Sequence, residues 1–263
     1  MWELYDRLID SIPEGPVVED AFISEYRSLV KAGDYYGLGS MAKKGSRQPE
    51  RGGRVIGLPL REVASYIKSW NPYEAALGHA AINTWYNSPE AARAAGIVLN
   101  PRANMEDRQN DPFITCQNTI RGKKVAIMGH FPYIEQLIEP VCELSIFEDT
   151  EDDNSYFADT YPYAACEYMF PEQDVIFLPS HTFSSRTLPR LLELSAGAYL
   201  ILVGPTTPMT PLLFDFGIDN LSGFIIMDGK KAGDTVTGRD RVISLYSSGQ
   251  KVCLRKDVSS SSL

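Results

Sequence analysis

Cysteine, histidine and positive charge are scarce in this chain of 263 residues. Four cysteines and three histidines are present, and 25 lysines and arginines against 34 aspartates and glutamates give a formal net charge of −9. Because Cys116, Cys142, Cys166 and Cys253 form no C-x-x-C pair, zinc-knuckle and dithiol motifs are excluded, and reduced, mostly buried thiols are expected. The acidic balance offers no basic surface to a phosphate backbone, so nucleic acid is not expected as a partner.

A long apolar run is also missing. The first residues, MWELYDRLIDSIPEG, carry acidic side chains early and predict an amphipathic helix instead of a signal peptide. No stretch approaches the roughly 20 apolar residues that cross a membrane. We therefore expect a cytoplasmic protein with no membrane partner, whose last residues, 257–263, form a disordered tail.

The hydrophobic pattern of the first part of the chain changes from period two to period 3.6. Residues 15–39 hold alternating β-branched or aromatic stretches broken by glycine, which predicts an antiparallel meander. Three helices are expected next, over 59–70, over 71–87 with Asn71 as cap, and over 88–96 with Ser88 as cap. The Gly37 and Gly39 pair is interpreted either as the hinge of a flap or as a hairpin turn. These elements predict an α+β domain over residues 1–98.

A polar stretch with no sustained periodicity follows, and we interpret residues 99–121 as a linker. Beyond it, continuous apolar strands alternate with amphipathic helices from 122 to 256. Strands buried on both faces and separated by helices predict a parallel, Rossmann-like sheet with right-handed crossovers. The acidic run at 147–159 is expected to be mainly a solvated loop.

Ligands of an open parallel sheet bind at the carboxyl ends of its strands, so these ends are the expected site. Gly129 in GHFP allows a sharp turn, and the N–H groups of the following helix favour an anion. A dinucleotide site needs G-x-G-x-x-G, whereas GHFPYI keeps one glycine, which disfavours NAD and also weakens the case for S-adenosylmethionine.

Glu148 ends the next strand, where an acid binds ribose hydroxyls in nucleotide-binding folds, although a plain surface acid fits the pattern as well. In GPTTP, Gly204 opens space, and the hydroxyls of Thr206 and Thr207 are candidates to bind a carboxylate or phosphate. A plain strand-to-helix turn would use the same residue types.

Two of the three histidines, His130 and His181, fall at predicted strand ends. Imidazole serves as acid, base or metal ligand near neutral pH, which makes both residues candidates for a metal site and His130 a candidate for catalysis. No H-x-x-x-H pair is present, and His79 in mid-helix is expected to be a packed histidine.

Several stretches together resemble one known family: LGHAAINTWYN from residue 77, GKKVAIMGHFPYIEQL from 122, LPRLLELS from 188 and LVGPTTPMTPLLFDFGIDNLSGF from 202. They resemble the heavy-metal chelation family DUF364 with its N-terminal DUF4213 region. The resemblance implies an enolase N-terminal-like domain, a Rossmann-like domain, a cleft between them, and a role in metal homeostasis through chelator or siderophore-like compounds.

Carried over position by position, the family's motifs fall on Asn83, Gly129, His130, Phe131, Pro132, Glu148, Thr187, Gly204, Pro205, Thr207 and Pro208. This chain departs from the family pattern in SHTFSSRTL, where Ser185 and Arg186 replace an asparagine and a small residue. Arg186 would add an anion-binding group beside His181 and Thr182 at the rim of the site.

These observations together predict a two-domain protein that binds a small anionic or heterocyclic ligand, such as a pterin, a flavin or a chelator precursor. Phe131 would stack on a flat ring, Glu148 would bind hydroxyls, His130 would act as acid or base, and Thr206 would hold an anionic group. A non-catalytic protein that binds a metal or a metal chelate is the alternative, and an S-adenosylmethionine-dependent methyltransferase is a further one. Aromatic side chains in NTWYN and in SYFADTYPYAACEYMF are candidates for a homodimer surface, and core packing explains them equally well.

Overall fold

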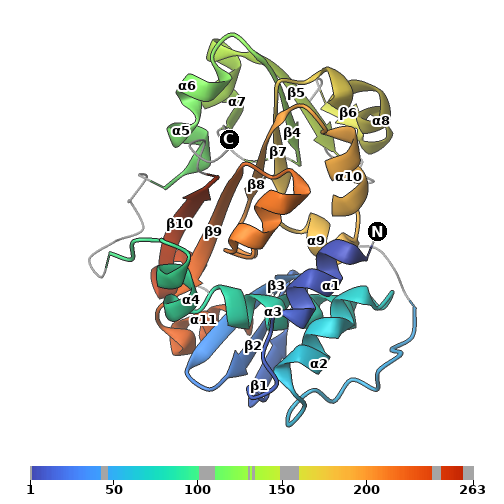
Figure 1. Cartoon of the computed structure of the whole chain (residues 1–263), viewed down its shortest axis with the longest axis vertical. Helices are drawn as coiled ribbons and strands as arrows, with labels where there is room; N and C mark the ends of the chain where they lie inside the picture. Colours follow the sequence, from blue (N-terminus) through green and yellow to red (C-terminus); the bar gives the residue numbers. More distant parts are fainter. Residues whose placement is uncertain are drawn as a thin grey trace, which may run out of the picture.

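The computed structural model describes residues 2–42, 47–100, 110–129, 131, 134–148, 160–238 and 244–256. Two sheets organise the fold: a three-stranded antiparallel sheet and a seven-stranded, mostly parallel one. The smaller sheet and its helices lie below the larger sheet in Figure 1, and the ends of the larger sheet's central strands point toward them. The expected α/β fold class is confirmed. None of the described helices has the length and apolar character that crossing a membrane requires.

The smaller sheet is the predicted meander, ordered β1-β2-β3. Helix α1 (Glu3–Asp10) precedes β1 (Asp20–Ile23), β2 (Arg27–Ala32) and β3 (Tyr35–Ser40). Helix α2 (Leu60–Ala64) continues into the 3-10 helix η1 (Ser65–Lys68), and α3 (Pro72–Tyr86) and α4 (Pro89–Ala94) follow. The helix expected over 59–70 is therefore present, with its second half wound as a 3-10 turn.

Helix α3 begins where the sequence predicts. The Asn71 side chain accepts hydrogen bonds from the backbone N–H groups of Tyr73 and Glu74, and Pro72 occupies the first helical position, where no N–H is needed. Ser88 caps α4 in the same way, by accepting from the Ala91 N–H. Both caps use local hydrogen bonds, which is why the sequence alone located them.

Gly37 and Gly39 bring β3 against α3 with backbone nearly touching backbone. A Cβ atom at Gly37 would lie 2.0 Å from the Thr84 nitrogen, and one at Gly39 would lie 2.2 Å from the Ala76 carbonyl oxygen. Both glycines lie inside β3, so the prediction of a flap hinge or a hairpin turn was wrong. They are needed for close packing between a strand and a helix.

The larger sheet has the order β10-β9-β8-β7-β4-β5-β6. Its strands are β4 (Lys124–Met128), β5 (Glu143–Glu148), β6 (Thr160–Pro162), β7 (Val175–Pro179), β8 (Tyr199–Val203), β9 (Asn220–Ile226) and β10 (Gly249–Arg255). Strands β4 to β9 pair in parallel, as predicted, while β10 pairs antiparallel with β9. The strand order reverses between β4 and β7, which makes this the switch point of a Rossmann-like sheet.

The helices that precede and connect these strands are short. They are α5 (Pro112–Thr115), α6 (Gln117–Ile120), α7 (Ile134–Ile138), α8 (Cys166–Met169), α9 (Thr182–Ser185), α10 (Leu188–Leu194) and α11 (Gly229–Val236), with 3-10 turns η2 (Glu139–Val141), η3 (Tyr163–Ala165), η4 (Phe170–Glu172), η5 (Pro211–Phe216) and η6 (Leu245–Ser248). Helices α5 and α6 lie within the expected linker. Phe113, Cys116 and Ile120 from them pack in one hydrophobic cluster with the strands, so the second half of that linker is part of the folded core.

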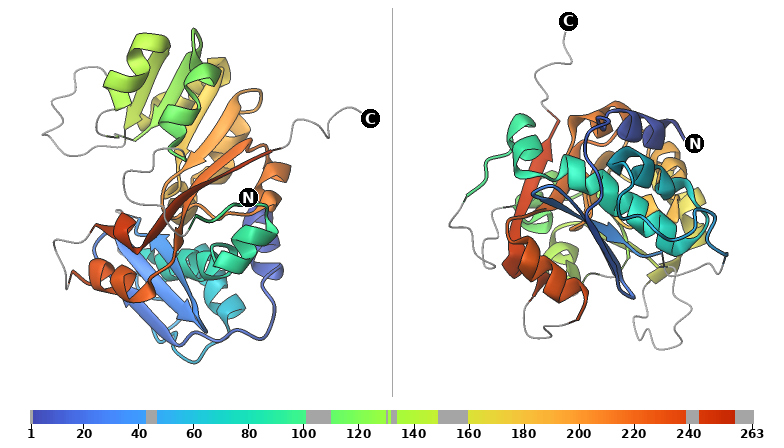
Figure 2. Two further views of the ribbon diagram at one scale, coloured as in Figure 1. Left: turned by 90° about the vertical axis from the view of Figure 1, so that its left-hand side faces the viewer. Right: turned by 90° about the horizontal axis from the view of Figure 1, so that it is seen from below.

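The segment between β9 and β10 returns to the smaller sheet. Ala232 and Val236 of α11 and Leu245 of η6 share a hydrophobic cluster with Leu29 and Leu38 of β2 and β3. Figure 2 shows these late helices beside the first strands. The N-terminal layer is therefore completed by a segment from the end of the chain, a long-range contact that a division at residue 98 does not capture.

Candidate functional site

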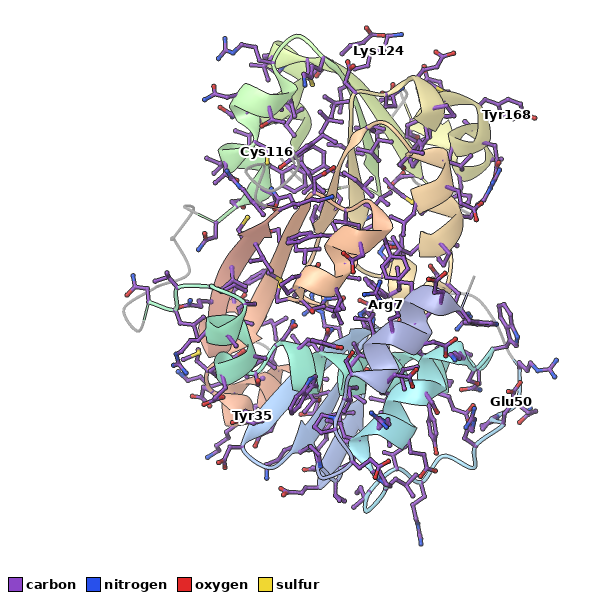
Figure 3. All side chains as sticks on the ribbon, viewed as in Figure 1. Arg7, Tyr35, Glu50, Cys116, Lys124 and Tyr168 are labelled. Carbon is purple, nitrogen blue, oxygen red and sulfur yellow. The ribbon has the colours of Figure 1, made fainter. Side chains whose placement is uncertain are left out.

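The carboxyl ends of the parallel strands lie next to the smaller domain. Lys124, which begins β4, lies at the opposite end of the molecule in Figure 3, and α9, which follows β7, lies beside α1 in Figure 1. Helix α9 contacts α3 directly. The loops after β7 and β8 that the sequence singled out therefore meet the helices of the N-terminal domain.

A polar stripe along α3 binds the GPTTP loop. The stripe consists of His79, Asn83 and Asn87, which are spaced four residues apart, the last at the end of the helix. His79 Nε2 donates to the Thr206 carbonyl oxygen over 2.7 Å, and Asn83 Nδ2 donates to the same oxygen over 2.8 Å. Asn87 donates to the Thr207 carbonyl over 2.9 Å and accepts from the Met209 N–H over 2.9 Å. All three side chains are buried, so this stripe fixes the backbone of the loop against α3.

The hydroxyl of Thr206 links both domains. Its Oγ1 lies 2.6 Å from Ser40 Oγ, at the end of β3, and 2.7 Å from Ser180 Oγ, after β7. Thr206 is buried, and its hydroxyl is engaged in this chain of three hydroxyls instead of facing an anion. A Cβ at Gly204, where φ is 135°, would lie 2.3 Å from Ser180 Oγ, so the space beside this glycine is filled by Ser180 and not by a ligand.

The rest of this loop is also close-packed. Thr207 and Pro208 are buried and Pro205 is half-buried. Thr207 Oγ1 and Asn83 Oδ1 are buried atoms with no hydrogen-bond partner among the described residues. Asn83 contacts the neighbouring domain through the Thr206 carbonyl oxygen. The threonine loop, a candidate from the sequence to bind a carboxylate or phosphate, lies at this domain junction.

His79 is held as a neutral imidazole. Burial lowers its pKa to about 4, and the hydrogen bond to Thr206 opposes this shift, while the charge of His181 reinforces it. Because Nε2 must carry the proton to donate to a carbonyl, Nδ1 is left as the acceptor, and it lies 3.4 Å from the Ser40 nitrogen. His79 is thus a packed, hydrogen-bonded histidine, as the sequence predicted.

Gly129 directly follows β4, and Glu148 ends the neighbouring strand β5, beside the switch point. Gly129 has φ of 85°, its N–H donates to the Phe147 carbonyl over 2.7 Å, and a Cβ there would meet only the Phe131 ring, at 4.0 Å. Glu148 ends β5, and its Oε2 is buried without a partner among the described residues. The ends of β4 and β5 therefore place the side-chain-free backbone of Gly129 and the unpartnered carboxylate oxygen of Glu148 at adjacent strand ends.

Phe131 is already involved in ring packing. Its ring centroid lies 5.2 Å from that of Phe113, which stacks on Phe177 at 5.0 Å. The side chain joins the hydrophobic cluster on this face of the sheet, so only part of the ring remains for the expected stacking on a ligand.

The loop after β7 is anchored to the N-terminal domain by Arg186. Its Nη1 donates to the Ser69 carbonyl over 2.7 Å, its guanidinium lies 4.7 Å from the Trp70 ring centroid, and its φ is 61°. Burial lowers the pKa of Arg186, and its Nε has no described partner. Arg186 therefore serves first as an interdomain contact, and its buried, unpartnered Nε–H is a donor that could serve the expected role toward an anion.

The other candidates on this loop differ in exposure. His181 is exposed, and Thr182 is buried with its hydroxyl donating to the Pro179 carbonyl over 2.7 Å. Thr187 is half-buried, with its hydroxyl 2.8 Å from Ser185 Oγ. Of these side chains, His181 is the one positioned to meet a molecule from solvent.

Some predicted residues lie outside the described part of the chain: His130, Pro132 and most of the acidic run, residues 149–159. Within the described residues, no group of three or more histidine, cysteine, aspartate or glutamate side chains could hold a metal ion.

Ser40, Ser180 and Asn87 contribute to the junction and were not predicted from the sequence. The four-residue spacing of His79, Asn83 and Asn87 is the signal that could have revealed the stripe, since such residues share one face of a helix. Ser40 and Ser180 carried no such signal because only tertiary contact brings their hydroxyls together.

Comparisons with known proteins agree with this architecture. The DUF364 family model, described as "Putative heavy-metal chelation", matches residues 111–254, and the DUF4213 model, with the same description, matches residues 5–86. Among curated proteins, no significant match is found.

Two solved structures resemble the whole chain. A DUF364 protein of unknown function from Desulfitobacterium hafniense is 41% identical, with a TM-score of 0.86, covering 97% of this chain and 99% of that one. A second, from Pyrococcus horikoshii, is 20% identical, with a TM-score of 0.72 and coverage of 96% and 98%, and it supports the fold alone. From the family match and the 41% identity over nearly its full length, this chain belongs to the DUF364 family, with a DUF4213 region at its N-terminus.

Proposed function

We propose that this protein is an enzyme that binds a small, hydroxyl-bearing heterocyclic compound, of the nucleoside, pterin or flavin kind, at the carboxyl ends of β4 and β5. The observation that carries the proposal is the buried Oε2 of Glu148, which has no partner among the described residues.

A buried carboxylate oxygen without a hydrogen bond costs about 1–3 kcal/mol or more. A ligand hydroxyl that donates to Glu148 would remove this cost. The position supports the same conclusion, because an acid at the end of the second strand of a Rossmann-like sheet binds ribose hydroxyls. β5 is that strand here, since it follows β4 in the chain and pairs with it in parallel.

Gly129 supports the proposal from the adjacent strand. With its positive φ and no side chain, it permits a ligand to approach the backbone closely. The single glycine disfavours a tightly bound pyrophosphate, so the ligand class is a monocyclic or fused heterocycle with hydroxyl groups and not a dinucleotide.

The N-terminal domain would hold the rim of this site in place. The stripe on α3 fixes the loop after β8, and Arg186 fixes the loop after β7. Polar contacts of this kind preorganise a site, because the loops need not be ordered when the ligand binds. Proton transfer to or from the ligand is assigned to His130 and His181, as the imidazoles predicted at the strand ends.

A binding panel tests the proposal. Adenosine, S-adenosylmethionine, a pterin, a flavin mononucleotide and a ferric catechol chelate would be screened by thermal shift and then by calorimetry. The Glu148→Gln variant is compared with Glu143→Gln, which removes an exposed carboxylate at the start of the same strand. We expect one heterocycle to bind wild type and Glu143→Gln equally and Glu148→Gln at least about tenfold more weakly.

Incubation with that heterocycle, followed by mass spectrometry, tests the enzymatic part. Equal binding to both variants would refute the role of Glu148. Stabilisation by the ferric chelate alone, with no chemical change, would instead support a non-catalytic protein that binds metal chelates.

A further inference from the structure

We propose that Cys116 and Cys253 form a two-thiolate binding site for a soft monovalent cation such as Cu(I), separate from the site at the strand ends. Cys116 lies at the junction of α5 and α6, and Cys253 lies on β10. Figure 3 shows Cys116 in the upper part of the molecule, away from the smaller domain.

One amide group connects the two thiols. Asn220 Nδ2 donates to Cys116 Sγ over 3.6 Å, and Cys253 Sγ donates to Asn220 Oδ1 over 3.1 Å. Because the nitrogen and the oxygen of an amide are bonded to the same carbon, both sulfur atoms lie around one small group. The two thiols are 137 positions apart in the sequence, which is why spacing rules gave no indication of the pair.

The strand register explains the arrangement. Asn220, the first residue of β9, pairs with Arg255, and Ser222 pairs with Cys253. Side chains two residues apart on a strand share a face, so Asn220, Cys253 and Arg255 lie on the same face of the β9–β10 pair. Cys116 approaches this face from the α5–α6 corner, where it packs with Phe113 and Ile120.

Arg255 supplies the positive charge that two thiolates need. Burial raises the pKa of both thiols, and the Arg255 guanidinium opposes this shift at both of them. Two thiolates with a monovalent cation carry a net charge of −1, which Arg255 balances. A divalent cation would leave the buried site with a net positive charge, so charge balance favours the monovalent ion.

The number and type of the ligands further restrict which metal ion the site would bind. Thiolates select soft ions, whereas zinc sites need four ligands, or three and a water. Within the described residues no group of three or more histidine, cysteine, aspartate or glutamate side chains is arranged to hold a metal ion. A pair of sulfur ligands suits an ion that accepts two-coordinate geometry, which Cu(I) does.

Binding is a proton exchange with no redox step. The S–H bonds of Cys116 and Cys253 break, two metal–sulfur bonds form, and two protons leave to solvent. The hydrogen bond from Cys253 to Asn220 is lost, while the Asn220 N–H group can still donate to the sulfur of Cys116. Cys253 is only half-buried, so the ion has a route from solvent.

The experiment titrates the reduced full chain anaerobically with Cu(I), in competition with a chromogenic Cu(I) chelator, and counts bound copper by native mass spectrometry. Cys116→Ser and Cys253→Ser remove the proposed ligands, while Cys142→Ser and Cys166→Ser remove the other two cysteines. We expect one tightly held Cu(I) in the wild type and in both controls, and none in either ligand variant. Arg255→Gln should weaken binding by roughly 10- to 100-fold, as for other groups that support metal ligands.

Two results would overturn the proposal: copper that persists in Cys116→Ser and Cys253→Ser, or a wild type that takes up no copper while its thiols are shown to be reduced. Because Cys116 is buried, circular dichroism checks that the Cys116→Ser variant folds. If that variant does not fold, the result for Cys253→Ser decides the question. A Cys116–Cys253 disulfide in the protein after exposure to peroxide, without copper uptake by the reduced form, would indicate a redox pair instead.

Discussion

His79 Nε2 donates a 2.7 Å hydrogen bond to the carbonyl oxygen of Thr206, across the junction of the two domains. The bond requires a neutral imidazole with its proton on Nε2, and burial provides one by lowering the pKa to about 4. The contact therefore connects the packing of two domains to the protonation state of one residue.

The free energy of unfolding should fall with pH below neutrality because of His79. Its folded pKa of about 4 lies below the unfolded value of 6.5, so between these values the unfolded chain binds a proton that the folded chain excludes. The stability that comes from keeping His79 neutral in the folded protein is fully present above pH 6.5. It is lost progressively as the pH falls toward 4. At pH 5 the loss should be roughly 2 kcal/mol.

Urea denaturation at pH 7.5 and at pH 5 measures this effect. His79→Gln lacks the titrating group, so the stability difference between wild type and variant should shrink by roughly 2 kcal/mol at pH 5. His181→Gln, which changes an exposed histidine, should retain most of the pH dependence. A constant difference between wild type and His79→Gln at both pH values would contradict the prediction.

Asn87→Leu should destabilise the protein by about 3 kcal/mol or more. The variant keeps a similar volume but leaves the Thr207 carbonyl and the Met209 N–H buried without their partner. Chemical denaturation measures the change, and Asn118→Ala, at an exposed position on α6, is the control, with an expected change within about 0.5 kcal/mol. A loss no larger than that of the control would show that Asn87 is not needed at the junction.

Gly37→Ala should lower stability by about 3 kcal/mol and reduce the thermal midpoint accordingly. The added methyl group would lie 2.0 Å from the Thr84 nitrogen and 2.3 Å from the Ala80 carbonyl oxygen, so β3 and α3 must separate. Gly15→Ala is the matched control, since its added Cβ meets nothing within 4 Å. Similar thermal midpoints for the two variants would mean that the strand and helix can shift apart at little cost.

Much of the fold follows from local signals in the sequence. Asn71 with Pro72 located the start of α3, and Ser88 located α4, because a cap satisfies hydrogen bonds within a few residues. The buried strands β4, β5, β7, β8 and β9 followed from their apolar runs. The stretch after residue 110 was missed because α5 and α6 are too short for a periodic pattern.

The sequence by itself determined the α/β class with an antiparallel meander and a parallel sheet, the helix starts, and the strand ends at which polar residues gather. Only the tertiary structure decided what those residues do. It placed Thr206 between Ser40 and Ser180, left Glu148 with an unsatisfied oxygen, and brought Cys116 and Cys253 to one amide. The reason is physical: caps and periodicity are local, whereas hydrogen bonds between residues 26 to 166 positions apart depend on how the chain packs.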